Sequence, residues 1–144
     1  MTDLMATHLY RCPLRWADMD VYGVVNNVVY LRLLEEARVD LIWRIGPAGG
    51  ERALCEGYVV VRHAIEYKRP LVHRREPILI EMWVSSVQAA TVSLEYEVKD
   101  DDRVYALAST TMAPYDFDRK FPRRLTDAEA TFFQQFLENR RAIG

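Results

Sequence analysis

One segment with helical periodicity, residues 28–45, most constrains how this chain can fold. Its apolar residues recur at the spacing i, i+3, i+4, i+7 and i+11, which puts them on one face of an α-helix. The residues of this face are Tyr30, Leu33, Leu34, Ala37 and Leu41. A second stripe at spacing i, i+4, which we expect to meet solvent, consists of Arg32, Glu36, Asp40 and Arg44. Gly46 and Pro47 follow and are expected to end the helix.

The segments around this helix have the period of two that is typical of β-strands. They cover residues 8–16, 57–69, 77–87, 91–99 and 103–115. In the segment 57–69, the side chains expected on one face are those of Val59, Val61, Ile65 and Tyr67. Three aspartates at 100–102 fit a hairpin turn between the last two strands. The sequence therefore predicts four consecutive antiparallel strands after the helix.

Thr126 and Glu129 have the spacing of a capping box, which predicts a C-terminal helix over residues 126–139. The element order favours an α+β class, in which an antiparallel sheet is wrapped around the long helix at 28–45. The 144 residues fit a single domain spanning 1–144, with its core at about 8–118.

Composition and charge disfavour several classes of protein. Apolar residues make up 50% and charged residues 28% of the chain, as in soluble globular proteins. The net charge of -2 argues against a nucleic-acid partner or an anionic membrane. No window approaches the ~18 apolar residues of a membrane span, and the first residues lack the apolar segment of a secretory signal. We therefore expect a cytoplasmic protein.

The two cysteines and three histidines show no spacing typical of a metal site. Cys12 and Cys55 are expected to be buried free thiols in a reducing compartment, although a disulfide between them stays open. No GxGxxG, Walker, HExxH or CxxC pattern is present. The sequence thus predicts neither a metal nor a cofactor.

The loop before the helix contains the residues best suited to catalysis. A helix that begins near Asn26 or Asn27 leaves backbone N–H groups without intrahelical partners, at the positive end of its dipole. These groups would polarise a carbonyl oxygen, and Gly23 allows a tight turn and close approach of a ligand. Asp20 could then act as nucleophile or as general base on a water. The competing interpretation is that these residues only cap the loop and the helix, and Asp18 fits that role best.

The segment DMDVYGVVNNVVYLRLLEEAR, residues 18–38, resembles the active-site signature of hotdog-fold acyl-CoA thioesterases of the 4-hydroxybenzoyl-CoA thioesterase type. The positions that match it are Asp18, Asp20, Gly23, Asn26, Asn27 and Tyr30. The later HAIEYKRPL and the succession of strands are also similar to the family, so the resemblance covers roughly residues 8–118.

This resemblance implies roles for several residues. Asp20 matches the catalytic carboxylate, and the backbone N–H of Asn27 matches the group that polarises the thioester carbonyl. Family members are dimers joined edge to edge by their strands, and often tetramers, with sites at the interface. We therefore expect the strand at 58–69 of a neighbouring subunit to complete the site. Close relatives often have histidine directly after the glycine, where this chain has Val24, so that residue's role does not transfer.

For His63 and for the basic cluster around Pro70, the sequence allows both a structural and a functional interpretation. His63 is in phase with the apolar residues of its strand, which favours a core or interface histidine over a proton carrier beside Asp20. The basic cluster around Pro70 is either a solvated loop or a contact for the phosphates of coenzyme A. The residues expected to bind substrate are Asn26, Tyr30, His63, Lys68, Arg69 and Arg74.

The leading hypothesis is an acyl-CoA thioesterase that releases a free acid and coenzyme A, with acyl-carrier-protein thioesters as a further option. The apolar VVNNVV stretch slightly favours a non-polar acyl group. The alternative is a non-catalytic hotdog module that binds acyl-CoA, for which the Asp20 carboxylate would be unnecessary. A hotdog dehydratase is disfavoured because the chain lacks the histidine–aspartate pair of that chemistry. A serine hydrolase is disfavoured because no GxSxG turn is present.

Overall fold

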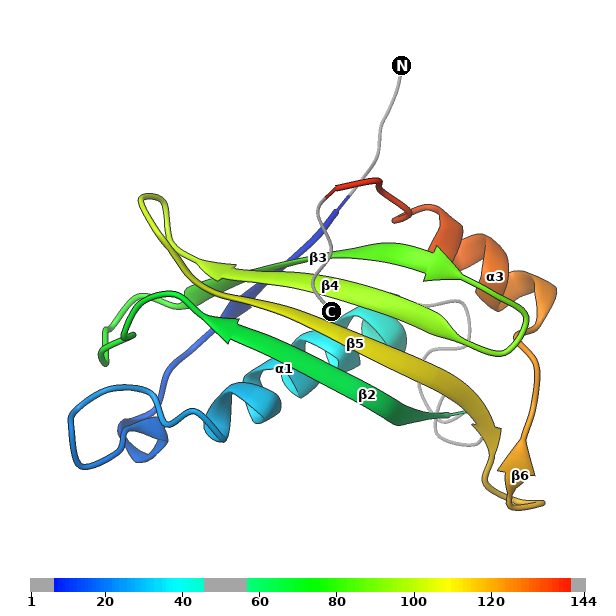
Figure 1. The fold of residues 1–144 in the computed structure, drawn as a ribbon, viewed down its shortest axis with the longest axis horizontal. Coiled ribbons are helices and arrows are strands. Elements are labelled where there is room, and N and C mark those ends of the chain that lie inside the picture. The colour runs from blue at the N-terminus through cyan, green and yellow to red at the C-terminus, as the bar shows by residue number, and fades with distance from the viewer. Residues whose placement is uncertain (1–6, 46–56, 141–144) are drawn as a thin grey trace.

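The computed structural model describes residues 7–45 and 57–140, which form one antiparallel sheet with helices against it (Figure 1). In chain order the elements are β1 (His8–Cys12), η1 (Trp16–Asp18), α1 (Val29–Val39), η2 (Asp40–Ile45), β2 (Tyr58–Tyr67), β3 (Ile78–Val87), β4 (Val92–Lys99), β5 (Val104–Asp116), β6 (Phe121–Pro122) and α3 (Asp127–Gln134). The η1 element is a 3-10 turn, and η2 is a π-helical turn that continues α1.

The strands lie in the order β1-β3-β4-β5-β2, and all neighbours pair antiparallel. β6 adds a short pairing at the end of β5. Figure 1 shows α1 along one face of the curled sheet and α3 at the end beside β3. β1 and β2 are therefore the two edges of the described sheet, and the predicted α+β class is confirmed.

The core forms between α1 and the concave face of the sheet. All five residues of the predicted apolar helix face are buried, as the periodicity indicates: Tyr30, Leu33, Leu34, Ala37 and Leu41. Alternate residues of the central strands meet them, and these are Ile80, Met82, Val84, Leu94, Tyr96, Val98, Ala106 and Ala108. At about 25 cal/mol per Å² of buried apolar surface, this contact is the main term that stabilises the helix on the sheet.

Cys12 is a free thiol at the end of β1 and lies in this core, as expected. Burial raises its pKa to about 11, so the thiol stays protonated and behaves as a small apolar residue. Cys55 lies outside the described residues.

The α-helical part is shorter than the predicted 28–45, with 11 residues from Val29 to Val39. It begins later than Asn26 because the preceding chain is held in long-range backbone hydrogen bonds. Val25 N–H donates to the Leu71 carbonyl at 2.7 Å, and Asn26 N–H donates to the Asp18 carbonyl at 3.0 Å. η2 then continues to Ile45, while Gly46 and Pro47 lie outside the described residues.

The charged stripe on α1 does not simply meet solvent, which corrects the prediction. Arg32 donates to the buried Asp18 carboxylate at 2.8 Å, and the Asp40 carboxylate lies 2.7 Å from His8 Nε2. Both partners are distant in sequence, so periodicity alone could not reveal them. Nothing is described of the Arg44 side chain.

A register shift between Val60 and Arg62 divides β2. His63, Ile65 and Tyr67 share one face, as predicted, but Val60 rather than Val61 lies opposite the buried Met112. An extra residue in one strand reverses the alternation beyond it, which an uninterrupted period of two cannot anticipate.

The capping box of the C-terminal helix is confirmed, because the Thr126 and Glu129 side chains each accept the other's backbone N–H. The helix α3 ends at Gln134, before the predicted residue 139. Beyond it the chain pairs with β3, since Val84 N–H donates to the Phe136 carbonyl and Glu138 N–H donates to the Val84 carbonyl. These bonds to the sheet replace further helical bonds.

Candidate active site

A tight loop carries Asp20 and Gly23 from η1 to the start of α1. Met19 and Val25 form an antiparallel bridge, and inside it Asp20 N–H donates to the Val24 carbonyl at 2.9 Å. Gly23 N–H closes the turn on the Asp20 carbonyl at 3.0 Å. Gly23 has φ +78°, where a side chain is strained, although the space around it is open. Glycine is thus required here by backbone conformation.

The Asp20 carboxylate caps its own loop with one oxygen. Oδ1 accepts the N–H groups of Tyr22 at 2.8 Å and Val24 at 3.5 Å. Within residues 7–45 and 57–140, no hydrogen-bond donor lies at Oδ2. Loop capping therefore occupies one carboxylate oxygen of Asp20 and leaves the other without a donor among these residues.

Asp18 has the structural role predicted for it. Its side chain is fully buried and accepts hydrogen bonds from Arg15 N–H and the Arg15 and Arg32 guanidinium groups. Burial alone would raise the pKa of Asp18, but these bonds hold it below its usual value. Asp18 therefore stays ionised and fastens η1 to α1.

A cavity of about 350 Å³ lies between this loop, the start of α1 and the end of β2. Five residues of the predicted site line it, namely Asp20, Asn27, Tyr30, Lys68 and Arg69. The remaining wall is mostly apolar and consists of Val24, Val25, Tyr67, Pro70 and Leu71. The fold thus gathers residues far apart in sequence around one hollow, whose size and lining suit an organic ligand.

Tyr67 is a wall residue that the sequence did not single out. Its hydroxyl donates to the Asn27 carbonyl at 2.8 Å, and its ring packs edge-on against Tyr30 at 5.2 Å between centroids. Alternation along β2 put Tyr67 on the inner face, but only the strand pairing brings it opposite Asn27. It fixes the backbone at the entrance to α1.

The backbone N–H groups at the start of α1 differ from one another in their partners. Val28 N–H donates to Asn26 Oδ1 and Val29 N–H donates to the Asn26 carbonyl, both at 2.9 Å. In the part of the chain that the structure describes, the Asn27 N–H has no acceptor. It lies just before the first turn of α1, near the positive end of the helix dipole.

Three predicted substrate contacts do not line this cavity. The Asn26 side chain accepts the Val28 N–H just before α1, and Arg74 donates to Asp100 Oδ2 at 2.8 Å. His63 Nδ1 lies 2.8 Å from Thr110 Oγ1, further along β2. Burial and the nearby Arg38 lower the pKa of His63, against a smaller opposing effect of Glu35. Within this chain His63 is not placed beside Asp20.

Two basic residues, Lys68 and Arg69, line the cavity. Lys68 is already paired with Glu66, its Nζ lying 2.5 Å from the carboxylate.

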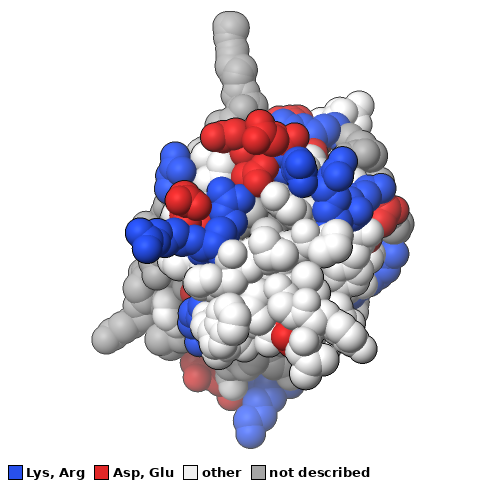
Figure 2. All heavy atoms as spheres, turned by 90° about the vertical axis from the view of Figure 1, so that its left-hand side faces the viewer, with Lys and Arg blue, Asp and Glu red and all other residues white. Residues whose placement is uncertain are grey.

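Figure 2 shows that Lys and Arg side chains gather above a broad uncharged area on this end of the molecule. Several apolar side chains of the two loops here are exposed, namely Trp16, Val21, Tyr22, Val28 and Val72. Arg123, a further arginine near the C-terminus, instead binds Glu129 at 2.8 Å.

Residues 7–45 and 57–140 contain neither a cluster of metal ligands nor a helix able to cross a membrane. No group of three or more His, Cys, Asp or Glu side chains is arranged to hold a metal ion. No helix there is both long and apolar enough to cross a membrane.

A family model identifies the protein family of this chain. The model of the thioesterase-like superfamily matches residues 14–139, which include the Asp20 loop, α1 and the whole sheet after it. The chain belongs to the thioesterase-like superfamily. Among curated proteins, none gives a significant match to it.

Solved structures show the same fold. A predicted thioesterase from Bacillus stearothermophilus is 14% identical, with a TM-score of 0.83 over 94% of this chain and 100% of that one. PA2801 of Pseudomonas aeruginosa, thought to be a thioesterase, is 27% identical, with a TM-score of 0.69 over 84% of this chain and 93% of its own. A thioesterase from Thermus thermophilus, solved with coenzyme A and Zn, is 22% identical, with a TM-score of 0.73 over 89% of this chain and 92% of its own.

The curled antiparallel sheet and its helix are therefore the hotdog-type thioesterase fold. Membership in this superfamily supports thioester hydrolysis as the general class of activity.

Proposed function

We propose that this protein hydrolyses an acyl-CoA thioester to a free acid and coenzyme A, with Asp20 as nucleophile or general base. The proposal rests on one observation: a carboxylate oxygen and a backbone N–H, both without hydrogen-bond partners among the described residues, belong to residues that line the same cavity. Asp20 Oδ2 and the Asn27 N–H both lack partners among the described residues, and both residues line the same hollow. Acyl transfer to water needs a carboxylate that attacks or activates water, and an N–H group that stabilises the oxyanion.

In the general-base route, Asp20 takes a proton from water while the water oxygen attacks the carbonyl carbon. The carbonyl oxygen becomes an oxyanion that accepts the Asn27 N–H, aided by the dipole of α1. Collapse of the tetrahedral intermediate breaks the carbon–sulfur bond, and the departing thiolate takes up the proton. In the nucleophilic route the Asp20 carboxylate attacks the carbonyl carbon, and the carbon–sulfur bond breaks to release the thiolate and leave an acyl–aspartyl anhydride. Water then hydrolyses the anhydride to the free acid and Asp20, and the thiolate takes up the proton that the water gives up.

The loop geometry fits this use of Asp20. Two loop N–H groups hold Oδ1, so the side chain is oriented before substrate arrives. Tyr67 holds the Asn27 carbonyl in the same way. Fixing both groups in advance lowers the cost of organising them in the transition state.

Coenzyme A is the carrier we propose. A structural neighbour from Thermus thermophilus was solved with coenzyme A, which supports a substrate of that kind. Lys68 and Arg69 line the cavity, and arginine pairs well with phosphate oxygens. Arg74 is bound to Asp100 and would have to leave that partner to join them.

We further propose that two chains associate through β2. This strand lies at an edge of the described sheet, and its Val60 and Val61 are exposed at 43% and 62%. An open apolar edge favours pairing with another strand. Such pairing would bring a neighbour's β2 toward the site, where His63 of that strand remains a candidate contact.

A non-catalytic acyl-CoA-binding module is the alternative. It would use the same cavity but gain nothing from a carboxylate beside the thioester, because a buried acyl group needs apolar contacts and not a charge.

The test is thiol release from a panel of acyl-CoAs, from acetyl to palmitoyl with benzoyl and phenylacetyl added. Turnover of any member supports hydrolysis, and the preferred member gives the acyl class. Tight binding of an acyl-CoA without thiol release would contradict the proposal and favour the binding module. For an active substrate, hydrolysis in oxygen-18 water separates the routes, because label in the Asp20 carboxylate requires the covalent one.

A further inference from the structure

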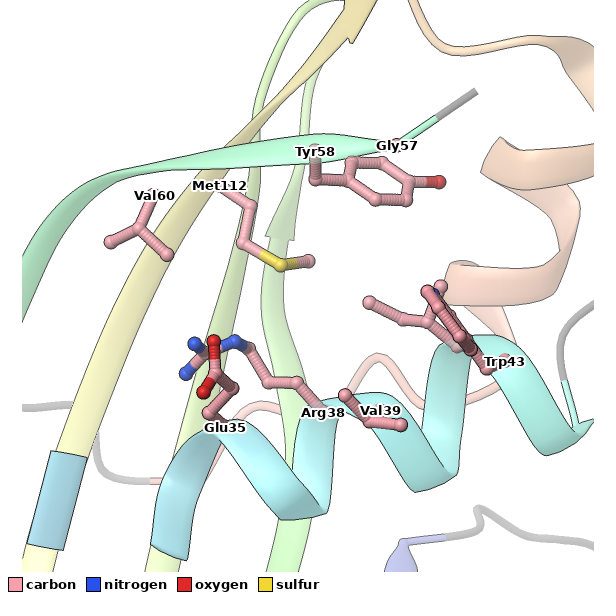
Figure 3. Close-up of a pocket in the computed structure, with 9 residues that line it drawn as sticks. Glu35, Arg38, Val39, Trp43, Gly57, Tyr58, Val60 and Met112 are labelled. Carbon is pink, nitrogen blue, oxygen red and sulfur yellow. The ribbon is translucent and has the colours of Figure 1, made fainter. Parts of the chain in front are cut away.

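A second cavity, of about 210 Å³, lies at the other end of α1, between this helix and the beginning of β2. None of its wall residues belongs to the Asp20 cavity. Figure 3 shows the Arg38 side chain reaching to one end of the cavity beside Glu35, with Trp43 at the other end. The apolar part of the wall consists of Val39, Ile42, Trp43, Val60 and Met112.

Arg38 is a mostly buried cation that has no ion-pair partner among residues 7–45 and 57–140. It is 8% exposed, and in the described part of the chain it forms one hydrogen bond, from Nη1 to the Tyr96 hydroxyl at 3.1 Å. Among the described residues, no carboxylate forms an ion pair with it. A guanidinium carries five N–H donors, so most of its capacity is unused. Among the described residues, the fully buried nitrogens without a partner include none of Arg38, so its unused donors are open to the cavity, where an anion can reach them.

The groups around Arg38 leave most of its donors unused. Burial raises the pKa of Tyr96, so its hydroxyl stays neutral and donates to Thr110 Oγ1 at 2.8 Å. His63 bonds the same Thr110 hydroxyl. Glu35 lines the cavity, but its side chain is exposed and forms no ion pair with Arg38. A ligand that brings its own negative charge would complete the network.

We propose that this cavity binds a small apolar monocarboxylate, with the carboxylate on Arg38 and the hydrocarbon against Trp43, Val60 and Met112. Arginine matches a carboxylate with two parallel hydrogen bonds. A cavity of about 150 Å³ already accommodates benzene, so benzoate, phenylacetate or hexanoate fits the available size. Free acids of this kind are also products of thioester hydrolysis, but the proposal holds whether or not the chain is a thioesterase.

The experiment is calorimetric titration of the intact protein with benzoate. We expect one benzoate per chain, and at least ten-fold weaker binding of benzyl alcohol, which has a similar shape without the charge. Arg38→Gln should weaken benzoate binding by about 10- to 100-fold, as expected when a charged hydrogen-bonding partner is lost. Arg69→Gln, the matched change at the Asp20 cavity, should leave benzoate affinity unchanged.

Three results would overturn the proposal. One is equal binding of benzoate and benzyl alcohol by the wild-type protein, a comparison that depends on no variant. Another is unchanged benzoate affinity in Arg38→Gln. The third is loss of binding in Arg69→Gln rather than in Arg38→Gln, because the acid would then occupy the Asp20 cavity.

Discussion

Asp18 and Asp20 are the same residue type in one short segment, yet their surroundings give them different roles. Asp18 is buried and forms ion pairs with Arg15 and Arg32. Asp20 is half-buried at a cavity, with one oxygen in the loop and the other without a partner among the described residues. The sequence could show the spacing of the pair. It could suggest Asp18 as the structural member, but not that Arg32 holds it, because that contact forms only when α1 folds back on η1.

Removal of the Asp18 carboxylate should therefore destabilise the protein much more than removal of that of Asp20. We expect Asp18→Ala to lower the free energy of unfolding by about 3 kcal/mol, since two arginines lose a buried partner. Asp20→Ala, which loses only the cap of an exposed loop, should cost about 1 kcal/mol. Urea denaturation of both variants measures the difference. Equal stabilities would mean that Asp18 does not fasten η1 to α1.

At the scale of elements, α1 illustrates what periodicity can and cannot predict. Its buried face was predicted residue by residue, because apolar spacing follows directly from helix geometry. The predicted segment 28–45 also begins within one residue of Val29. A start as early as Asn26 or Asn27 is wrong, because the bonds of Val25 to Leu71 and of Asn26 to Asp18 hold the chain extended up to that point. The register shift in β2 escaped prediction for a similar reason, since pairing with β5 defines it. Tyr67 joins the site only through that pairing.

The Asn26 side chain lies just before α1, and its Oδ1 accepts the Val28 N–H. Asn26→Ala should lower the free energy of unfolding by about 1 kcal/mol, because the Val28 N–H at the entrance to α1 loses its acceptor. Asn26→Asp keeps the acceptor and should be close to wild type. Thermal or urea unfolding of the two variants provides the measurement. If Asn26→Ala were as stable as Asn26→Asp, this hydrogen bond would contribute nothing.

At the scale of the whole molecule, the open β2 edge predicts association. Light scattering at micromolar concentration should give at least twice the 16.8 kDa mass of one chain. Val61→Lys on β2 should weaken association by about 100-fold or more, because it buries a charge in the strand pairing. Leu9→Lys, the matched change on the opposite edge strand β1, should not. A monomeric wild-type protein would contradict the shared site.

Glu81 connects distant parts of the molecule, and this predicts how stability changes with pH. It accepts hydrogen bonds from Thr7 at 2.6 Å and Lys99 at 2.5 Å, and pairs with Arg140 at 3.4 Å. Burial would raise the pKa of Glu81, but these partners lower it to about 2 from 4.5. Between these values the unfolded chain binds more protons than the folded one, so stability rises with pH.

The free energy of unfolding should therefore fall as the pH drops from 4.5 to 2, and stay nearly constant just above that range. Glu81→Gln, which keeps an acceptor without the charge, should lose less stability over the same interval. Urea titrations at several pH values test this. If both proteins lost the same free energy of unfolding as the pH falls, Glu81 would not be a source of this loss.

The central claim is that Asp20 takes part in the chemistry and does not only cap its loop. Asp20→Asn separates the two roles, because the amide oxygen can still accept the Tyr22 and Val24 N–H groups while the charge is gone. Asp116→Asn is the matched control, since Asp116 Oδ1 caps another loop by accepting two N–H groups at 3.0 Å.

The measurement is kcat/KM for the best acyl-CoA substrate, with folding of every variant checked by circular dichroism. We predict that Asp20→Asn loses about 100-fold or more while remaining folded, and that Asp116→Asn keeps wild-type activity. A folded Asp20→Asn protein with wild-type kcat/KM would contradict the account and leave Asp20 with only its role in the loop.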